Sequence, residues 1–115
     1  MSLMRFSPHS RVAVDLDVSF FSDDFLRRRK ARLTHISEEG AYFNFSKPLP
    51  IALTMALDVP LPGQDRPVHL VAEVLWAKKG VADKKPVYTH GLLFKKMDSD
   101  SRARLKAFID HTMNY

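Results

Sequence analysis

Several features that would indicate a particular kind of protein are missing from this sequence. Its 115 residues contain no cysteine, which excludes disulfides and thiolate chemistry. The first six residues lack the apolar run of a secretory signal peptide, and no window approaches the length of a membrane span. We therefore expect a cytoplasmic protein without membrane insertion. The sequence also allows residues 1–3 to be an added leader, with Met4 as the natural start.

Motifs of catalysis and metal binding are missing as well. The five histidines show no ligand spacing such as a helical i, i+4 pair, and there is no glycine-rich phosphate loop. Ser37, with His35 two residues before it, is the one local pair of nucleophile and base, but no nucleophile elbow surrounds it. We therefore expect no catalytic residues, no metal and no resident cofactor, and we do not expect an enzyme.

Positive charge is in mild excess. Lys and Arg total 18 against 13 Asp and Glu, a formal net charge of +5 with a pI of about 9.7. This balance favours an anionic partner such as phosphate, nucleic acid or a membrane surface. The strongest run, residues 27–30, has no interleaved aromatic beyond Phe25, which favours a solvated strand edge over a nucleic-acid patch. Nucleic acid is therefore not the expected partner.

Apolar residues alternate with polar ones along most of the chain. A hydrophobic content of 45%, with eight Phe, predicts one packed domain. Alternation with period two predicts strands that turn one face to the core. The expected strands cover residues 12–20, a second segment that 25–33 leads into, 41–45, 51–59, 68–76 and 87–95. Residues 60–67 and 83–86 are expected to link strands.

The end of the chain follows a different period. Residues 98–100 are suited to cap a helix, and Leu105, Phe108, Ile109 and Met113 then recur at helical spacing. We expect one amphipathic helix that covers an end of the sheet. Six strands with short turns and one helix predict a mainly β fold, either a small antiparallel barrel or a strongly bent sheet.

Within residues 34–43 the alternating strand pattern is interrupted by a polar corner between two strands. Gly40 can supply a positive φ there, and the Ser37 hydroxyl can accept bonds from backbone amides two or three residues ahead. Leu33 and Ile36 do not share a face of a regular strand, so a bulge is expected near His35. Gly91, in the sixth strand, is expected at a bend or a close approach.

Several segments follow one another in a distinctive order: Arg11 before the first strand, the corner His35-Ile36-Ser37-Glu38-Glu39-Gly40, Trp76, Gly91-Leu92-Leu93-Phe94, and the helix at 101–111. This order resembles the PilZ domain family, and the resemblance covers nearly the whole chain. It implies a six-stranded antiparallel split β-barrel with one C-terminal helix. It also implies a tail at 1–10 that takes part in a ligand switch, and a PilZ-like domain at 11–115.

The resemblance further implies a surface site for the second messenger cyclic di-GMP. In the family, an Arg-x-x-x-Arg pair wraps the ligand, and an Asp or Asn, a Ser and a Gly on the corner complete the site. Arg11, Ser37 and Gly40 match this pattern here. Ser7 stands where the family has its first Arg, and Arg5 is the candidate to replace it. His35 stands at the Asp or Asn position.

Two functions follow from the resemblance. In the first, the domain is a receptor that binds cyclic di-GMP through Arg5, Arg11, His35, Ser37 and Gly40 and relays the signal to an unknown protein partner. In the second, it is a PilZ-like adaptor that no longer binds the ligand and acts through protein contacts, for example in pilus assembly or motility. A basic nucleic-acid-binding barrel is a third interpretation, which rests on charge alone.

Overall fold

The computed structural model describes residues 11–22 and 28–113. It contains the following elements: β1 (Val12–Phe21), β2 (Arg29–Ile36), β3 (Gly40–Phe45), β4 (Thr54–Val59), β5 (Val68–Ala82), β6 (Lys85–Met97) and α1 (Ser99–Met113). The tail expected at 1–10, with Arg5 in it, lies outside the described residues.

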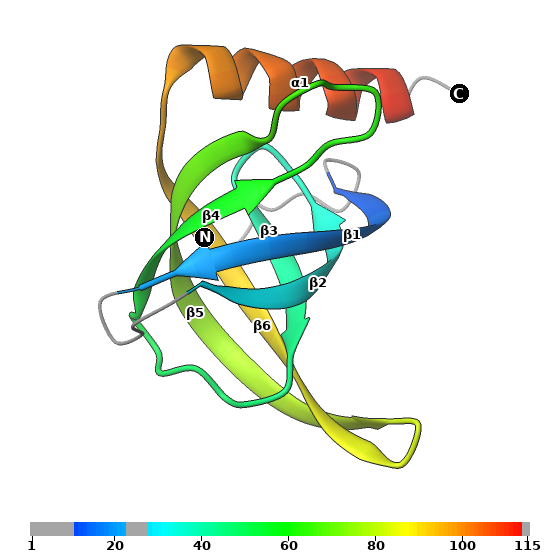
Figure 1. Cartoon of the computed structure of the whole chain (residues 1–115), viewed down its shortest axis with the longest axis vertical. Helices are drawn as coiled ribbons and strands as arrows, with labels where there is room; N and C mark the ends of the chain where they lie inside the picture. The colour runs from blue at the N-terminus through cyan, green and yellow to red at the C-terminus, as the bar shows by residue number, and fades with distance from the viewer. Residues whose placement is uncertain (1–10, 23–27, 114–115) are drawn as a thin grey trace, which may run out of the picture.

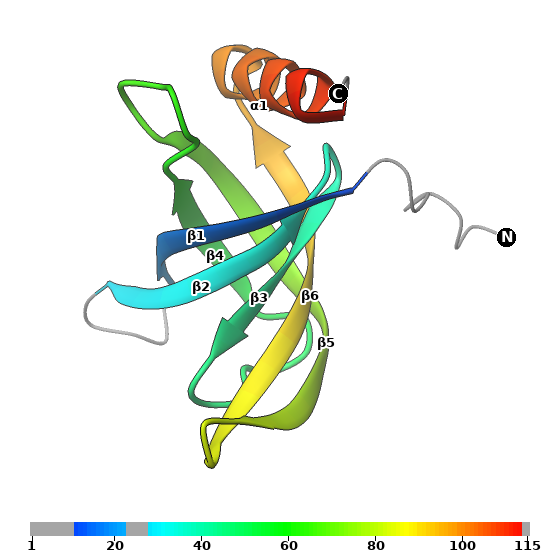
Figure 2. The ribbon, with the colours of Figure 1, turned by 90° about the vertical axis from the view of Figure 1, so that its right-hand side faces the viewer.

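The six strands form a closed ring. Each is hydrogen-bonded to two neighbours in the order β1-β2-β3-β6-β5-β4, and every pair is antiparallel. Helix α1 lies across one end of this barrel and packs against β5 and β1 (Figures 1 and 2). The predicted mainly β fold, a six-stranded antiparallel barrel with one C-terminal helix, is confirmed.

The core of the barrel is formed by the residues that face inward, which are every second residue along a strand. Phe20 is fully buried at its centre, with the rings of Phe43 and Phe45 at centroid distances of 5.4 and 5.1 Å. Helix α1 closes one end with Leu105 and Ile109, which are both buried. These are two positions of the predicted helical stripe, so the covering role of the helix is confirmed.

Two predicted strand boundaries are wrong. β4 begins at Thr54 rather than Ile51, which is 60% exposed, because Ala52 adopts a φ of 73° that no strand allows. The link expected at 83–86 is instead a two-residue turn, with φ values of 53° at Asp83 and 67° at Lys84. Two left-handed residues match the twist of a hairpin, so β5 and β6 run on together to this turn.

His90 on β6 is a buried polar residue in this core. Its Nε2 accepts a hydrogen bond of 3.0 Å from the backbone N–H of Leu49, and its ring packs edge-on against Phe43 at 5.3 Å. Burial lowers the pKa of His90, because the imidazolium form would lose its water shell. Protonation of Nε2 would also place two donors face to face.

The buried imidazole predicts a loss of stability in acid. Below about pH 6.5 the unfolded chain binds a proton that folded His90 resists, so the free energy of unfolding should fall by up to about 1.4 kcal/mol per pH unit. Urea unfolding between about pH 8 and 5 measures this slope. The control is His90→Gln, which keeps an acceptor without titrating and should have a shallower slope. Equal slopes for the two proteins would contradict the assignment.

Candidate functional site

The corner between β2 and β3 is held by the side chain of Ser37. Its Oγ accepts hydrogen bonds from the backbone N–H groups of Glu39 at 3.2 Å and Gly40 at 3.1 Å. The backbone N–H of Ser37 donates to the carbonyl oxygen of Gly40 at 2.9 Å. The predicted self-satisfied corner is confirmed. Ser37 is 2% exposed, so this hydroxyl is part of the turn itself.

The positive φ expected at Gly40 is wrong. Among the described residues, positive φ values fall at Ala52, Gly63, Asp83 and Lys84. Gly40 instead begins β3 in an extended conformation and is paired with Leu93 of β6. The hydrogen bonds of Ser37 close the corner without a left-handed residue. The predicted bulge near His35 is confirmed, since the β2–β3 register shifts between Leu33 and His35.

A row of residues crosses the outside of the barrel next to this corner. The strand registers place Ala13, His35, Tyr42, Gly91 and Trp76 opposite one another in turn, on five neighbouring strands. Tyr42 makes ring contacts on both sides, with His35 at 5.5 Å and with Trp76 at 5.4 Å between centroids. We call Tyr42, Trp76 and His35 the aromatic wall.

Gly91 lies between Tyr42 and Trp76 in this row. A Cβ atom at this position would lie 2.8 Å from Cζ2 of Trp76 and closer still to Nε1 and Cε2. The indole therefore covers the bare backbone of β6 and reaches Tyr42 across it. The close approach predicted for Gly91 is confirmed.

Arg11, just before β1, is attached to the aromatic wall. Its guanidinium carbon lies 4.8 Å from the centroid of the Tyr42 ring, and its Nη1 donates a hydrogen bond to the Tyr42 hydroxyl. A cation over an aromatic face is attracted by the ring quadrupole. Tyr42 therefore holds a positive charge at the edge of the wall, where an anion or the acceptor edge of a base can reach it.

The Ser37 corner and the aromatic wall with Arg11 meet at a hollow of about 100 Å³. It is lined by Arg11, Ser37, Gly40, Ala41, Tyr42, Leu75, Trp76, Gly91 and Leu92. Arg11, Ser37 and Gly40 are therefore gathered at one place. His35 lies beside the hollow, behind Tyr42, and Arg5 is outside the described residues. Tyr42 was not among the predicted site residues, although alternation places it on the same face as Gly40.

Metal binding and membrane spanning find no support in the described part of the chain. There, no three His, Asp or Glu residues come close enough together to hold a metal ion. In the same residues, no helix has both the length and the apolar character needed to cross a bilayer.

The sequence matches one known protein family. The PilZ domain model matches residues 7–111, which is most of the chain. The chain belongs to the PilZ domain family. PilZ domains are ligand-binding receptor or adaptor domains. No curated protein sequence matches this PilZ domain.

Solved structures share the fold at low sequence identity. The PilZ domain of YcgR from Escherichia coli, solved with c-di-GMP, is 17% identical, with a TM-score of 0.68 over 88% of this chain and 86% of that one. The inhibitor of motility MotI/DgrA from Bacillus subtilis is 17% identical, with a TM-score of 0.70 over 91% of this chain. The MrkH–c-di-GMP complex from K. pneumonia is 12% identical, with a TM-score of 0.71 over 90% of this chain. This PilZ domain spans 50% of the length of each of the last two proteins.

The packing of Trp76 on Gly91 predicts a large effect of one methyl group. Gly91→Ala should destabilise the domain by about 1–3 kcal/mol, or expel the indole, because the contact leaves no space for a Cβ. Urea unfolding and the emission of Trp76, the one tryptophan, measure both outcomes. Gly80→Ala is the matched control, since its nearest contact would be an ordinary 3.9 Å from Val87. The same small effect at both positions would contradict this packing.

Proposed function

We propose that this PilZ domain is a receptor for cyclic di-GMP and relays the signal to a protein partner. The observation that carries the proposal is the position of Arg11, which Tyr42 holds at the mouth of a hollow lined by Ser37, Gly40 and Trp76. Cyclic di-GMP has two phosphodiesters and two guanines. A guanidinium pairs with phosphate oxygens or with the O6/N7 edge of guanine, and aromatic faces stack on bases.

The size of the hollow determines how such a ligand would lie. Sites for whole small molecules usually have volumes of about 300 Å³ or more, and this hollow has about 100 Å³. It has room for one base or one phosphate group. The rest of the ligand would lie along the aromatic wall, past His35, and Arg5 would complete the site from the tail. A cytoplasmic setting remains a prediction of the sequence.

The second candidate, an adaptor without the ligand, is favoured by one observation. The Ser37 hydroxyl already accepts two backbone N–H groups and donates to the carbonyl oxygen of Gly40 at 3.2 Å. The corner therefore needs Ser37 for its own structure, and the motif would persist without a ligand. His35 also offers one acceptor where a carboxylate offers two oxygens. Arg11 and the aromatic wall are not explained by the turn, and we therefore place the receptor first.

Titration calorimetry of cyclic di-GMP into the protein tests the receptor. We expect saturable binding in the micromolar range, about 8 kcal/mol. Arg11→Ala should weaken it at least tenfold, because a charge-assisted hydrogen bond contributes about 1.5–3 kcal/mol. Arg102→Ala, an exposed change on α1, is the matched control and should bind as the original chain does.

The opposite result supports the adaptor. An absence of heat up to roughly millimolar ligand, where binding would provide only about 4 kcal/mol, would reject the receptor. Binding that Arg11→Ala leaves unchanged would reject the site, whatever its affinity.

A further inference from the structure

The hairpin of β5 and β6 extends past the end of the barrel. The pairing between β4 and β5 stops at Thr54 and Glu73, and that between β3 and β6 stops at Phe45 and Tyr88. Val74 of β5 still exchanges backbone hydrogen bonds with Ala52 and Leu53. From residue 77 to the turn, β5 is paired with β6 alone. Figures 1 and 2 show this ribbon projecting from the end of the barrel opposite α1. We call residues 77–87 the arm, and residues 77–86 are all exposed.

The arm carries most of the net charge of the chain. Four lysines, at 78, 79, 84 and 85, stand against the single acid Asp83, a formal charge of +3 within the total of +5. None of these lysines forms an ion pair with the residues that the structure describes. Lys95, nearer the barrel, is paired with Glu73 at 3.3 Å, whereas Lys30, Lys47, Lys96 and Arg102 are also without an ion pair among the described residues. The arm thus gathers four unpaired lysines on one projection.

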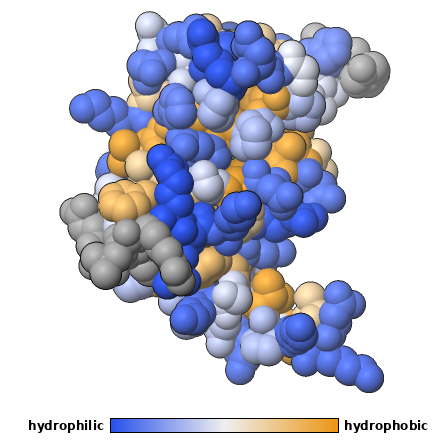
Figure 3. Space-filling model, viewed as in Figure 1, coloured by the Kyte–Doolittle hydropathy of each residue, from blue (hydrophilic) through white to orange (hydrophobic). Residues whose placement is uncertain are grey.

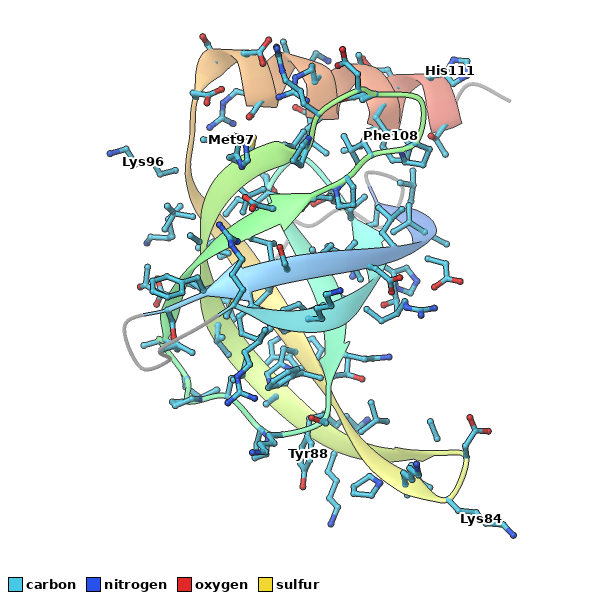
Figure 4. The ribbon with its side chains drawn as sticks, in the orientation of Figure 1. Lys84, Tyr88, Lys96, Met97, Phe108 and His111 are labelled. Carbon is cyan, nitrogen blue, oxygen red and sulfur yellow. The ribbon has the colours of Figure 1, made fainter. Side chains whose placement is uncertain are left out.

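The tip of the arm also exposes apolar surface. Val81 is 73% exposed, the most of any large hydrophobic residue that the structure describes, and it lies opposite Pro86. The pair of Lys79 and Tyr88 is two residues further back on the same face. Lys84 points outward from the turn in Figure 4, and Figure 3 shows the arm as a largely hydrophilic projection. The tip is therefore a small apolar pair with Lys79 on its own face and Lys84 in the turn, while Lys78 and Lys85 lie on the opposite face of the hairpin.

Protection of a free strand edge explains only part of this pattern. Lysines on an exposed edge discourage pairing with other chains, and Lys78 and Lys79 fit that role. Lys84 lies in the turn, where there is no edge to protect. An exposed Val81 would promote association rather than prevent it. The combination indicates a partner that takes both charge and apolar surface.

We propose that the arm docks on an anionic lipid bilayer surface. Its lysines would bind headgroup phosphates and carboxylates while Val81 rests in the headgroup layer, so that no segment spans the bilayer. A stable protein interface needs about 1,000 Å² of complementary surface, and a narrow convex ribbon offers little of it. Nucleic acid would neutralise the lysines but leave Val81 without an apolar contact. The arm itself contains no aromatic residue for base stacking, and of its two flanking aromatics Trp76 is packed on Gly91.

Co-sedimentation of the full chain with vesicles tests the docking. The probe is phosphatidylcholine containing about 30 mol% phosphatidylserine, compared with pure phosphatidylcholine. We expect binding to the anionic vesicles alone, weakened by salt. Lys79→Gln combined with Lys85→Gln should reduce it about 30-fold, at about 1 kcal/mol for each lysine. Lys96→Gln with Arg102→Gln removes the same charge at the other end of the molecule and should change binding little (Figure 4).

The apolar tip has its own test. Val81→Ser should weaken vesicle binding several-fold, because the transfer of a valine side chain out of water is favourable in free energy. Ile51→Ser removes a similarly exposed side chain off the arm and should have no effect. Equal binding to both kinds of vesicle, no binding, or equal losses in the arm and control variants would overturn the proposal. Tighter binding to an RNA or DNA oligonucleotide that depends on the lysines but not on Val81 would overturn it in favour of nucleic acid.

Discussion

The contact between the Trp76 indole and the backbone of β6 is the constraint on which the outer surface of this domain depends. It exists because Gly91 presents no side chain, and any Cβ there would overlap the indole. With the indole in place, Tyr42 has an aromatic neighbour across two strand spacings, and its ring and hydroxyl hold Arg11. Because Gly91 has no side chain, contacts among Trp76, Tyr42 and Arg11 join three strands and the segment before β1 into a single surface.

The sequence predicted the strands and the helix because those signals are local, and the family resemblance implied a barrel where the pattern left a barrel or a bent sheet open. Period-two alternation marked the strands, and the capping residues before α1 were confirmed by the 2.7 Å bond from the Ser101 N–H to Asp98. The misplaced boundaries lie where local signals are weak or absent. Ile51 continues the alternation of β4, yet Ala52 turns the chain, and nothing in Asp83-Lys84 resembles the glycine-containing dipeptides that mark a tight hairpin.

The candidate site was predictable only in part. Arg11, Ser37 and Gly40 were found through a family pattern, and the structure gathers them around one hollow. The pattern did not separate the structural role of Ser37 from a role in binding, since both require the same hydroxyl. Tyr42 was missed because its importance comes from registers across β2, β3, β6 and β5, which bring distant residues together. Strand register depends on pairing between segments and cannot be predicted from any one of them.

The emission of Trp76 during a titration with cyclic di-GMP tests the central claim most directly. The chain has one tryptophan, and it lines the hollow beside Arg11 and Tyr42. If this surface is the ligand site, the emission should change saturably, with the midpoint found by calorimetry, and the change should be lost in Arg11→Ala. Saturable heat with unchanged Trp76 emission would place the ligand elsewhere and contradict the account.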